Sequence, residues 1–147
     1  MRIVLDTNIW LDWFVFNDPA INTLKTWSAK PENTILIDEA CKQELISVLA
    51  YEKFSISGDR QQEISETIDD TCSFHITGTT EHQVWCKDPQ DEKFILLALS
   101  SHCDFLITKD LHLLKRKNYR IRSNERSSMK IVHPKVWSDL ITNQYII

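Results

Sequence analysis

Short apolar runs alternate with helical patterns along the whole sequence, and this alternation leaves few folds open. The apolar runs lack the strict apolar–polar alternation of a half-exposed strand, so we interpret them as strands buried on both faces. We predict five strands: Arg2–Leu5, Thr34–Ile37, Cys72–Thr77, Phe105–Thr108 and Met129–Val132. Strands that are each followed by a helix predict an α/β fold, in which helices cover both faces of a parallel sheet of about five strands.

Capping residues mark where several of the predicted helices begin. Asp18 and Asp88 each precede a proline, which is typical of an N-cap followed by the first helical position. The helical patterns cover Asn8–Phe16, a short segment after Asp18-Pro19, Glu39–Tyr51, Asp59–Thr71, Pro89 to about His102, Leu111–Lys117 and Pro134 to about Ile141. We predict that Asn118–Ser128 forms the one long polar loop.

Length and composition predict one compact domain that spans residues 1–147. A chain of 147 residues, of which 42% are apolar, is long enough to bury a core. Only two glycines occur, Gly58 and Gly78, and they stand alone. This composition excludes the glycine-rich phosphate loops of P-loop proteins and of dinucleotide-binding folds.

The sequence lacks the patterns of secreted and membrane proteins. Its first residues, MRIVLDTN, are interrupted by Asp6, unlike the apolar region of a signal peptide. No apolar run approaches the roughly 18 residues that span a bilayer. The four cysteines are scattered without a C-x-x-C pair, which favours reduced, mostly buried thiols. We therefore expect a cytoplasmic protein with no membrane association.

Charge is distributed unevenly along the chain. Between Lys109 and Lys135 there are nine basic residues and two acidic ones, a net charge of +7. The whole chain has a net charge of −4, so the remaining residues carry −11. A basic stretch on an acidic domain is typical of a nucleic-acid-binding protein, although solvated lysines and arginines around a surface loop give the same pattern.

Four acidic residues are predicted at or near one edge of the sheet. Asp6 follows the first strand, Asp110 lies two residues beyond the fourth, and Asp91 lies in the first turn of a helix that begins at this edge. Glu44 lies about six residues into the helix after the second strand, and its side chain can reach back to the same edge. Ligands bind at the carboxyl ends of parallel strands. With 21 acidic residues in the chain, a chance placement of some at strand ends stays open.

Four converging carboxylates would need a positive partner. Two carboxylates about 4 Å apart repel by about 4 kcal/mol at an effective dielectric constant near 20. Either several of them protonate, or a divalent cation neutralises the site. Carboxylate oxygens suit Mg²⁺ or Mn²⁺, which lower the pKa of a bound water and stabilise phosphoryl displacement. We interpret Asp88, which precedes Pro89, as a helix cap.

The order of these motifs resembles that of the PIN-domain nuclease family. The matching elements are the strand before Asp6-Thr7-Asn8, the helix with Glu44-Leu45, the run D-P-Q-D-E-K-F from Asp88 to Phe94, and Thr108-Lys109-Asp110. The D-P-x-D-x-K-F run and the closing Ile131-Val132-His133-Pro134 resemble toxin components of bacterial toxin–antitoxin systems. D-T-N alone is weakly specific, but all of these elements in this order, over almost the whole chain, are strongly specific.

The resemblance implies a Rossmann-like sheet and an endoribonuclease that cleaves single-stranded RNA with a water activated by Mg²⁺ or Mn²⁺. It also implies an antitoxin protein as partner and a homodimer. The catalytic residues and metal ligands would be Asp6, Glu44, Asp91 and Asp110. Asn8 and Thr108 would orient the ligands, and Asp88 would be a fifth acid that either adds an outer contact or only caps its helix. The alternative is a non-catalytic RNA-binding or regulatory module that retains the fold.

Two other motifs compete with this interpretation. Cys72, His75, His82 and Cys86 have a spacing superficially like that of zinc ligands. However, Cys72 and His75 lie an odd number of residues apart on one predicted strand, so their side chains face opposite sides of the sheet. Phosphatases of the haloacid dehalogenase type also begin with a strand-end aspartate, but they need a second aspartate where this chain has Asn8.

Four aromatic residues crowd the first predicted helix. They are Trp10, Trp13, Phe14 and Phe16. We favour packing in the core for this group. The alternative is an exposed patch that contacts a second copy of the chain or an antitoxin.

Overall fold

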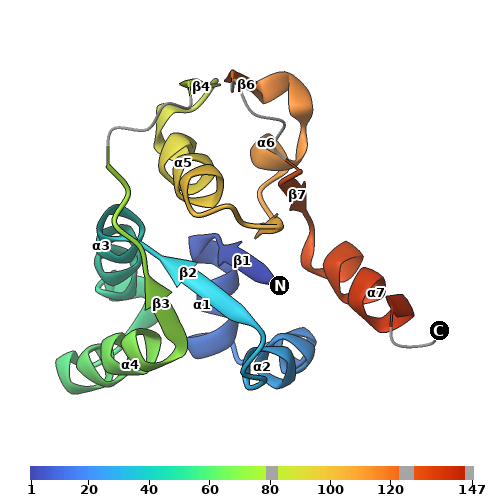
Figure 1. The fold of residues 1–147 in the computed structure, drawn as a ribbon. Helices are drawn as coiled ribbons and strands as arrows, with labels where there is room; N and C mark the ends of the chain where they lie inside the picture. Colours follow the sequence, from blue (N-terminus) through green and yellow to red (C-terminus); the bar gives the residue numbers. More distant parts are fainter. Residues whose placement is uncertain (79–82, 123–127, 145–147) are drawn as a thin grey trace.

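Five parallel strands form the central sheet of the computed structural model, which describes residues 1–78, 83–122 and 128–144 (Figure 1). They are β1 (Arg2–Leu5), β2 (Thr34–Ile37), β3 (Cys72–Phe74), β5 (Phe105–Ile107) and β7 (Lys130–Val132). The order across the sheet is β3-β2-β1-β5-β7, and every neighbouring pair is parallel. The predicted α/β fold is therefore confirmed. Because the chain turns one way from β1 to β2 and the other way to β5, the strand order reverses next to β1.

The predicted helices are present, although their ends differ by up to three residues. The α-helices are α1 (Thr7–Phe14), α2 (Asn22–Ser28), α3 (Glu39–Leu49), α4 (Gly58–Thr71), α5 (Glu92–Ser100), α6 (Leu111–Leu114) and α7 (Pro134–Gln144). Single turns of 3-10 helix are η1 (Pro19–Ile21), η2 (Glu52–Phe54), η3 (Pro89–Asp91) and η4 (Arg116–Asn118). The segments predicted as helices after Asp18 and from Leu111 each divide into a 3-10 turn and an α-helix. No described helix is long and apolar enough to cross a membrane.

Helices cover both faces of the sheet. Ile3, Val4 and Leu5 of β1 are all at most 2% exposed. Successive strand residues point to opposite faces, so protein must lie on each side of β1. Helix α5 packs against β1, β2 and β5 and buries five apolar side chains: Phe94, Ile95, Leu97, Ala98 and Leu99.

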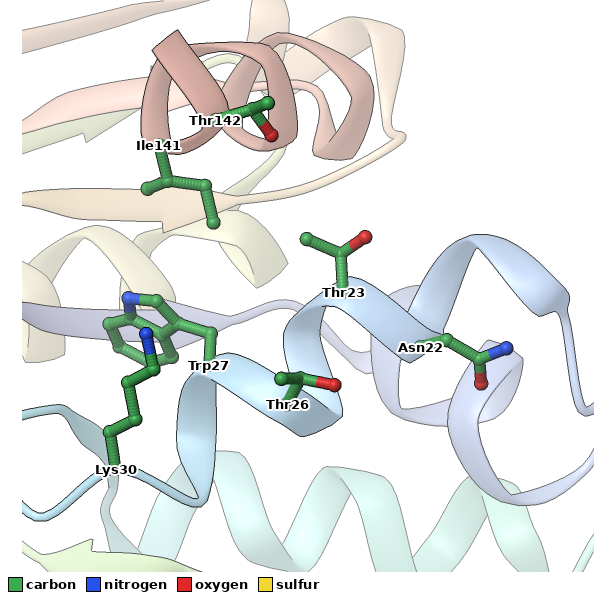
Figure 2. Close-up of a pocket in the computed structure, with 7 residues that line it drawn as sticks. All are labelled: Asn22, Thr23, Thr26, Trp27, Lys30, Ile141 and Thr142. Carbon is green, nitrogen blue, oxygen red and sulfur yellow. The ribbon is translucent and has the colours of Figure 1, made fainter. Parts of the chain in front are cut away.

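Helix α7 packs against α2 through two tryptophans. The ring centroids of Trp27 and Trp137 are 5.3 Å apart, with the rings nearly perpendicular. A pocket of about 380 Å³ opens between these two helices (Figure 2). It is lined by Asn22, Thr23, Thr26, Trp27, Lys30, Ile141 and Thr142. None of the predicted site residues is among them, so this pocket is separate from the predicted site.

A second sheet of two antiparallel strands, β4 (Gln83–Cys86) and β6 (Tyr119–Arg122), lies beyond α5 (Figure 1). The loop predicted over Asn118–Ser128 is therefore wrong for Tyr119–Arg122, while residues 123–127 lie outside the described residues. Half-buried Tyr119 and Ile121 alternate with exposed Arg120 and Arg122 in β6. The strand was not predicted because its alternating pattern covers only four residues and lies within a highly charged segment.

The third central strand is shorter than predicted. β3 ends at Phe74 instead of Thr77, although the His75 backbone N–H still donates to the carbonyl oxygen of Ile37 at 2.8 Å. His75 Nε2 lies 2.8 Å from the hydroxyl oxygen of Ser100. Of the four residues in the zinc-like spacing, Cys72 and Cys86 belong to different sheets, and His82 lies outside the described residues. All four cysteines are free.

The aromatic residues of the first helix differ in burial. Trp10 is 2% exposed, and the half-buried Trp13 and Phe14 pack against the core. Phe16 is 59% exposed and makes an edge contact with Phe54, with ring centroids 5.9 Å apart. The prediction of core packing is thus confirmed for Trp10 and wrong for Phe16, because α1 ends at Phe14 and Phe16 lies beyond its buried face.

Replacement of His102 by glycine is expected to raise the free energy of unfolding by about 0.5–1 kcal/mol. His102 has a φ of 54° after α5, where its N–H donates to Leu99 O and the Cys103 N–H donates to Ala98 O. This is a Schellman end, which favours glycine. Urea unfolding checks the prediction. His102→Ala, which keeps the Cβ, is the control; equal stabilisation by both variants would contradict a backbone origin.

Candidate active site

Asp6 lies where β1 meets α1 and caps the helix. Its side chain is buried, and Oδ1 accepts a hydrogen bond from the backbone N–H of Thr7 at 2.7 Å. Oδ2 accepts from the Thr108 hydroxyl at 2.6 Å and from the Asn8 amide at 3.3 Å. Thr108 follows β5, so these bonds join the loops at the carboxyl ends of two neighbouring strands.

Asn8 and Thr108 connect Asp6 with Asp110. The hydroxyl oxygen of Thr108, which is fully buried, accepts from the backbone N–H of Asp110 at 2.9 Å. The side chain of Asn8 donates to this hydroxyl at 3.5 Å and accepts from the backbone N–H of Lys109 at 3.3 Å. Asp110 caps α6 by accepting from the His112 N–H at 2.8 Å. Asn8 and Thr108 therefore lie where they can hold both aspartates in place.

Glu44 of α3 reaches toward α1 and α5. Its Oε2 accepts from the Thr7 hydroxyl at 2.5 Å, and its Oε1 forms an ion pair with Lys93 Nζ at 2.8 Å. The side chains of Glu44 and Lys93 are about a quarter exposed. The role of Lys93 is not among the sequence predictions, although this residue stands two positions after Asp91 in the D-P-x-D-x-K-F run. That position is the signal that could have identified it.

Asp91 and Asp88 have different environments although they lie in one turn. The Asp88 side chain accepts from the Gln90 N–H at 3.0 Å, so its prediction as a helix cap is confirmed. Asp91 makes no capping hydrogen bond. Its pKa is raised from 3.8 to about 6 by burial and by the charges of Asp110, Asp88 and Asp6, while His112 lowers it. Asp91 therefore belongs to the same electrostatic cluster as Asp6 and Asp110.

The pKa of Asp6 reflects both its burial and the carboxylates around it. It is raised from 3.8 to about 6, mainly by burial; the charges of Glu44 and Asp110 also raise it, while hydrogen bonds from Thr108 and Thr7 lower it. The structure thus brings the four predicted acids into electrostatic contact. We name Asp6, Glu44, Asp91 and Asp110 the acid cluster.

The donor chemistry of the acid cluster fits a hard divalent cation. It offers carboxylate oxygens, and two of its members have pKa values raised by burial, with a smaller contribution from neighbouring carboxylates. In the described ranges, however, no three His, Cys, Asp or Glu side chains are grouped closely enough to hold a metal ion as they lie. The acid cluster therefore has the ligands for Mg²⁺ or Mn²⁺ but would need side-chain rearrangement to bind it.

A second ion pair, which was not predicted, joins Lys109 to Asp12 next to the site. Lys109 Nζ lies 2.6 Å from Asp12 Oδ2, and Asp12 is buried in α1. Because Lys109 stands between Thr108 and Asp110, this contact ties α1 to the loop after β5. A buried charge that loses its partner is strongly destabilising, so this pair helps to hold α1 against the loop after β5.

Three comparisons with known proteins bear on this arrangement. A protein-family model described as PIN domain matches residues 2–112. The fold is similar to a crystal structure of VapBC2 from Rickettsia felis bound to a DNA fragment from their promoter. The TM-score is 0.62 at 14% sequence identity, over 90% of this chain and 98% of that one. A comparison with curated protein sequences finds no match.

The family match covers most of the chain and includes the segments that carry all four members of the acid cluster. The five-stranded parallel sheet and the similarity to the Rickettsia felis structure agree with it. The chain therefore belongs to the PIN domain family.

Proposed function

We propose that this protein is an endoribonuclease that depends on Mg²⁺ or Mn²⁺ and cleaves single-stranded RNA. The observation that carries the proposal is the acid cluster, in which Asp6 and Asp91 have raised pKa values beside Asp110. Carboxylates that are buried close to one another are unfavourable without a cation, whereas a cation-dependent enzyme uses the same charges to hold its metal. Membership of the PIN domain family supports a nuclease activity.

The cation would be held by Asp6, Asp91 and Asp110, and by Glu44 once its ion pair with Lys93 opens. When bound, it would lower the pKa of a water and stabilise the charge that develops on the phosphate. Asn8 and Thr108 would orient Asp6 and the loop of Asp110, through the hydrogen bonds described above. Asp88, which caps η3, would act only through its charge.

In this proposal Lys93 would have two alternative partners, Glu44 and a phosphate of the RNA. With the cluster empty, its ammonium group neutralises Glu44 at 2.8 Å. If Glu44 served as a cation ligand, the ammonium group would lose this partner and would be available to a nearby phosphate of the RNA. Lys93 would then contribute to substrate binding from the edge of the acid cluster.

We further propose that this single domain acts in the cytoplasm as the toxin of a toxin–antitoxin pair and forms a homodimer. The resemblance of the D-P-x-D-x-K-F run to toxin components supports this role, as does the fold similarity to VapBC2. An antitoxin would be the expected protein partner. A small reading frame beside the gene would support this assignment, because toxin and antitoxin must be made together.

Cleavage and metal binding test the proposal independently. Labelled single-stranded RNA, double-stranded RNA and single-stranded DNA are incubated with the protein in Mg²⁺, Mn²⁺ or EDTA. We expect cleavage of single-stranded RNA with either metal and none in EDTA. We also expect Mn²⁺ to raise the melting temperature by several degrees, because a ligand that binds only the folded state stabilises it.

The variants Asp91→Asn and Asp70→Asn make this test specific. Asp70 is an exposed acid of α4 outside the acid cluster, so its variant should cleave and bind metal normally. Asp91→Asn should lose both properties. Cleavage that persists in EDTA would contradict the metal mechanism. RNA binding without cleavage under any condition would favour the non-catalytic module.

A further inference from the structure

One face of the two-stranded sheet carries an exposed tryptophan next to arginines. Trp85 of β4 is 50% exposed and pairs in register with Arg120 of β6. Arg120 Cζ lies 5.6 Å from the centroid of the Trp85 ring. Arg122, two residues along the same strand, shares this face and is also exposed. We name Trp85, Arg120 and Arg122 the aromatic–arginine platform.

The opposite face of the same sheet explains why the platform points outward. Its residues are Val84, Cys86, Tyr119 and Ile121, which are buried or half-buried. They pack against the core, and β4 contacts α5. Because strand side chains alternate between faces, burial of this set directs Trp85 and both arginines away from the core. The exposure of Trp85 is therefore built into the sheet and is not the result of a loose loop.

The strand that carries Trp85 lies next to the turn that carries Asp91. β4 ends at Cys86, and the chain continues through Lys87 directly into η3, which ends at Asp91. β4 also contacts η3. In Figure 1, β4 and β6 lie beyond α5, the helix that follows Asp91. This proximity would let a strand of nucleic acid bound at the acid cluster continue toward the platform.

Within the described residues, the positive charge of the platform has no acidic partner. Eight of the nine basic residues between Lys109 and Lys135 are described, and of these only Lys109 forms an ion pair. Arg120 and Arg122 have no acidic partner in the described part of the chain. Such a surplus is complementary to a phosphate backbone.

We propose that the platform binds an unpaired nucleobase of the RNA, with the base stacked on Trp85 and a neighbouring phosphate held by Arg120 and Arg122. This inference rests on the proposed function and adds a substrate-binding site to it. An indole stacks on any base, and a guanidinium group both stacks and binds phosphate. In duplex RNA the bases are already stacked on one another, so the platform would favour single strands.

Binding measurements with variants of Trp85 test the base-stacking part. Fluorescence anisotropy follows a labelled single-stranded RNA of mixed sequence in EDTA, where cleavage is absent. Because base–aromatic stacking contributes about 1–3 kcal/mol, Trp85→Ala should raise the Kd by about 5–150-fold. Trp85→Phe should remain within about threefold, since phenylalanine also stacks. An abasic strand of the same length should bind Trp85→Ala and the parent protein equally.

Arg120→Gln tests the phosphate part, and Tyr51→Ala is the matched control. Loss of one phosphate contact should weaken binding and lower the slope of log Kd against log salt by about 0.7. Tyr51 is 51% exposed and has Lys53 Nζ 5.8 Å from its ring centroid, yet it follows α3 and is not part of the platform. Its variant should bind RNA normally.

The outcomes separate this inference from the proposed function. The platform is refuted if Trp85→Ala binds RNA as tightly as the parent, or if Tyr51→Ala weakens binding equally. If the parent cleaves RNA and Trp85→Ala has the same KM, the platform fails while the nuclease stands. If the parent cleaves no RNA but Trp85→Ala weakens binding, the platform stands and the nuclease fails. Urea unfolding verifies that each variant is folded.

Discussion

RNA cleavage by the Asp6→Asn variant is expected to fall by at least about 10³-fold, although the variant should be more stable than the parent protein in EDTA at pH 8. Asp6 lies at the reversal of strand order and interacts with Glu44, Asp91 and Asp110. Asparagine keeps the shape but removes the charge that would hold a divalent cation. A loss of about 4 kcal/mol of transition-state stabilisation corresponds to this decrease in rate.

The expected gain in stability follows from the raised pKa of Asp6. One pKa unit corresponds to about 1.4 kcal/mol, so a rise from 3.8 to about 6 destabilises the folded state by about 3 kcal/mol at neutral pH. Asparagine removes this destabilisation because it carries no charge. Its side chain can still accept a hydrogen bond from the Thr7 N–H, but the hydrogen bond from the Thr108 hydroxyl is disturbed. We therefore expect a net gain of about 1–2 kcal/mol.

The raised pKa of Asp6 also predicts how the stability of the parent protein changes with pH. Between about pH 4 and pH 6 the folded parent binds more protons than the unfolded chain, because the pKa of Asp6 is raised in the folded state. Its stability in EDTA therefore decreases as the pH rises through this range, and the destabilisation is complete above pH 6. Asp6→Asn should show a flatter dependence, with a remaining contribution from Asp91.

Urea unfolding of the parent, Asp6→Asn and Asp70→Asn at pH 5 and pH 8 measures both effects. Saturating Mn²⁺ should reverse the order and make the parent more stable than Asp6→Asn, because only the parent binds the cation. Asp70→Asn should follow the parent throughout. An Asp6→Asn variant that is less stable than the parent in EDTA at pH 8 would show that the charge of Asp6 is well accommodated without metal.

The Trp137→Ala variant is expected to lower the free energy of unfolding by about 3–5 kcal/mol. Trp137 is 2% exposed and packs edge-on against Trp27, which also lines the pocket between α2 and α7 (Figure 2). Removal of the indole leaves a cavity where the C-terminal helix meets the rest of the domain. Helix α7 follows β7, which is an edge strand, so few other contacts hold it in place.

A milder substitution at the same position separates packing from polarity. In the described part of the structure, the indole nitrogen of Trp137 is buried without a hydrogen-bond partner. Trp137→Phe loses some volume but also removes this unpaired donor, so the two effects partly cancel. We expect a decrease below about 1.5 kcal/mol. Trp85→Ala, on the exposed face of β4, should change the unfolding free energy by less than about 0.5 kcal/mol.

Circular dichroism during urea unfolding measures these differences. Equal losses for Trp137→Ala and Trp137→Phe would contradict the packing explanation, because phenylalanine preserves most of the contact with Trp27. A loss for Trp85→Ala similar to that for Trp137→Ala would show that the small sheet, and not the buried interface of α7, limits stability.

Local patterns were sufficient for the central sheet and for the location of the acids. β1 and β2 have the predicted bounds, because every residue of Ile3–Leu5 and Ile35–Ile37 is buried and therefore apolar. Asp6 and Asp110 were placed correctly because parallel strands end at one edge, which the order of strands and helices already implies. The cap at Asp88 could likewise be identified from the proline that follows it.

Contacts between distant segments could be known only from the folded chain. The pairing of Gln83–Cys86 with Tyr119–Arg122 depends on two short segments meeting, and neither has a strong pattern alone. The same holds for the ion pair between Glu44 and Lys93 and for the raised pKa of Asp6, which reflects burial and neighbouring charges. Local sequence patterns predict which residues are buried and which residues cap helices. Which charge lies beside which other charge is settled only when the helices and strands pack together.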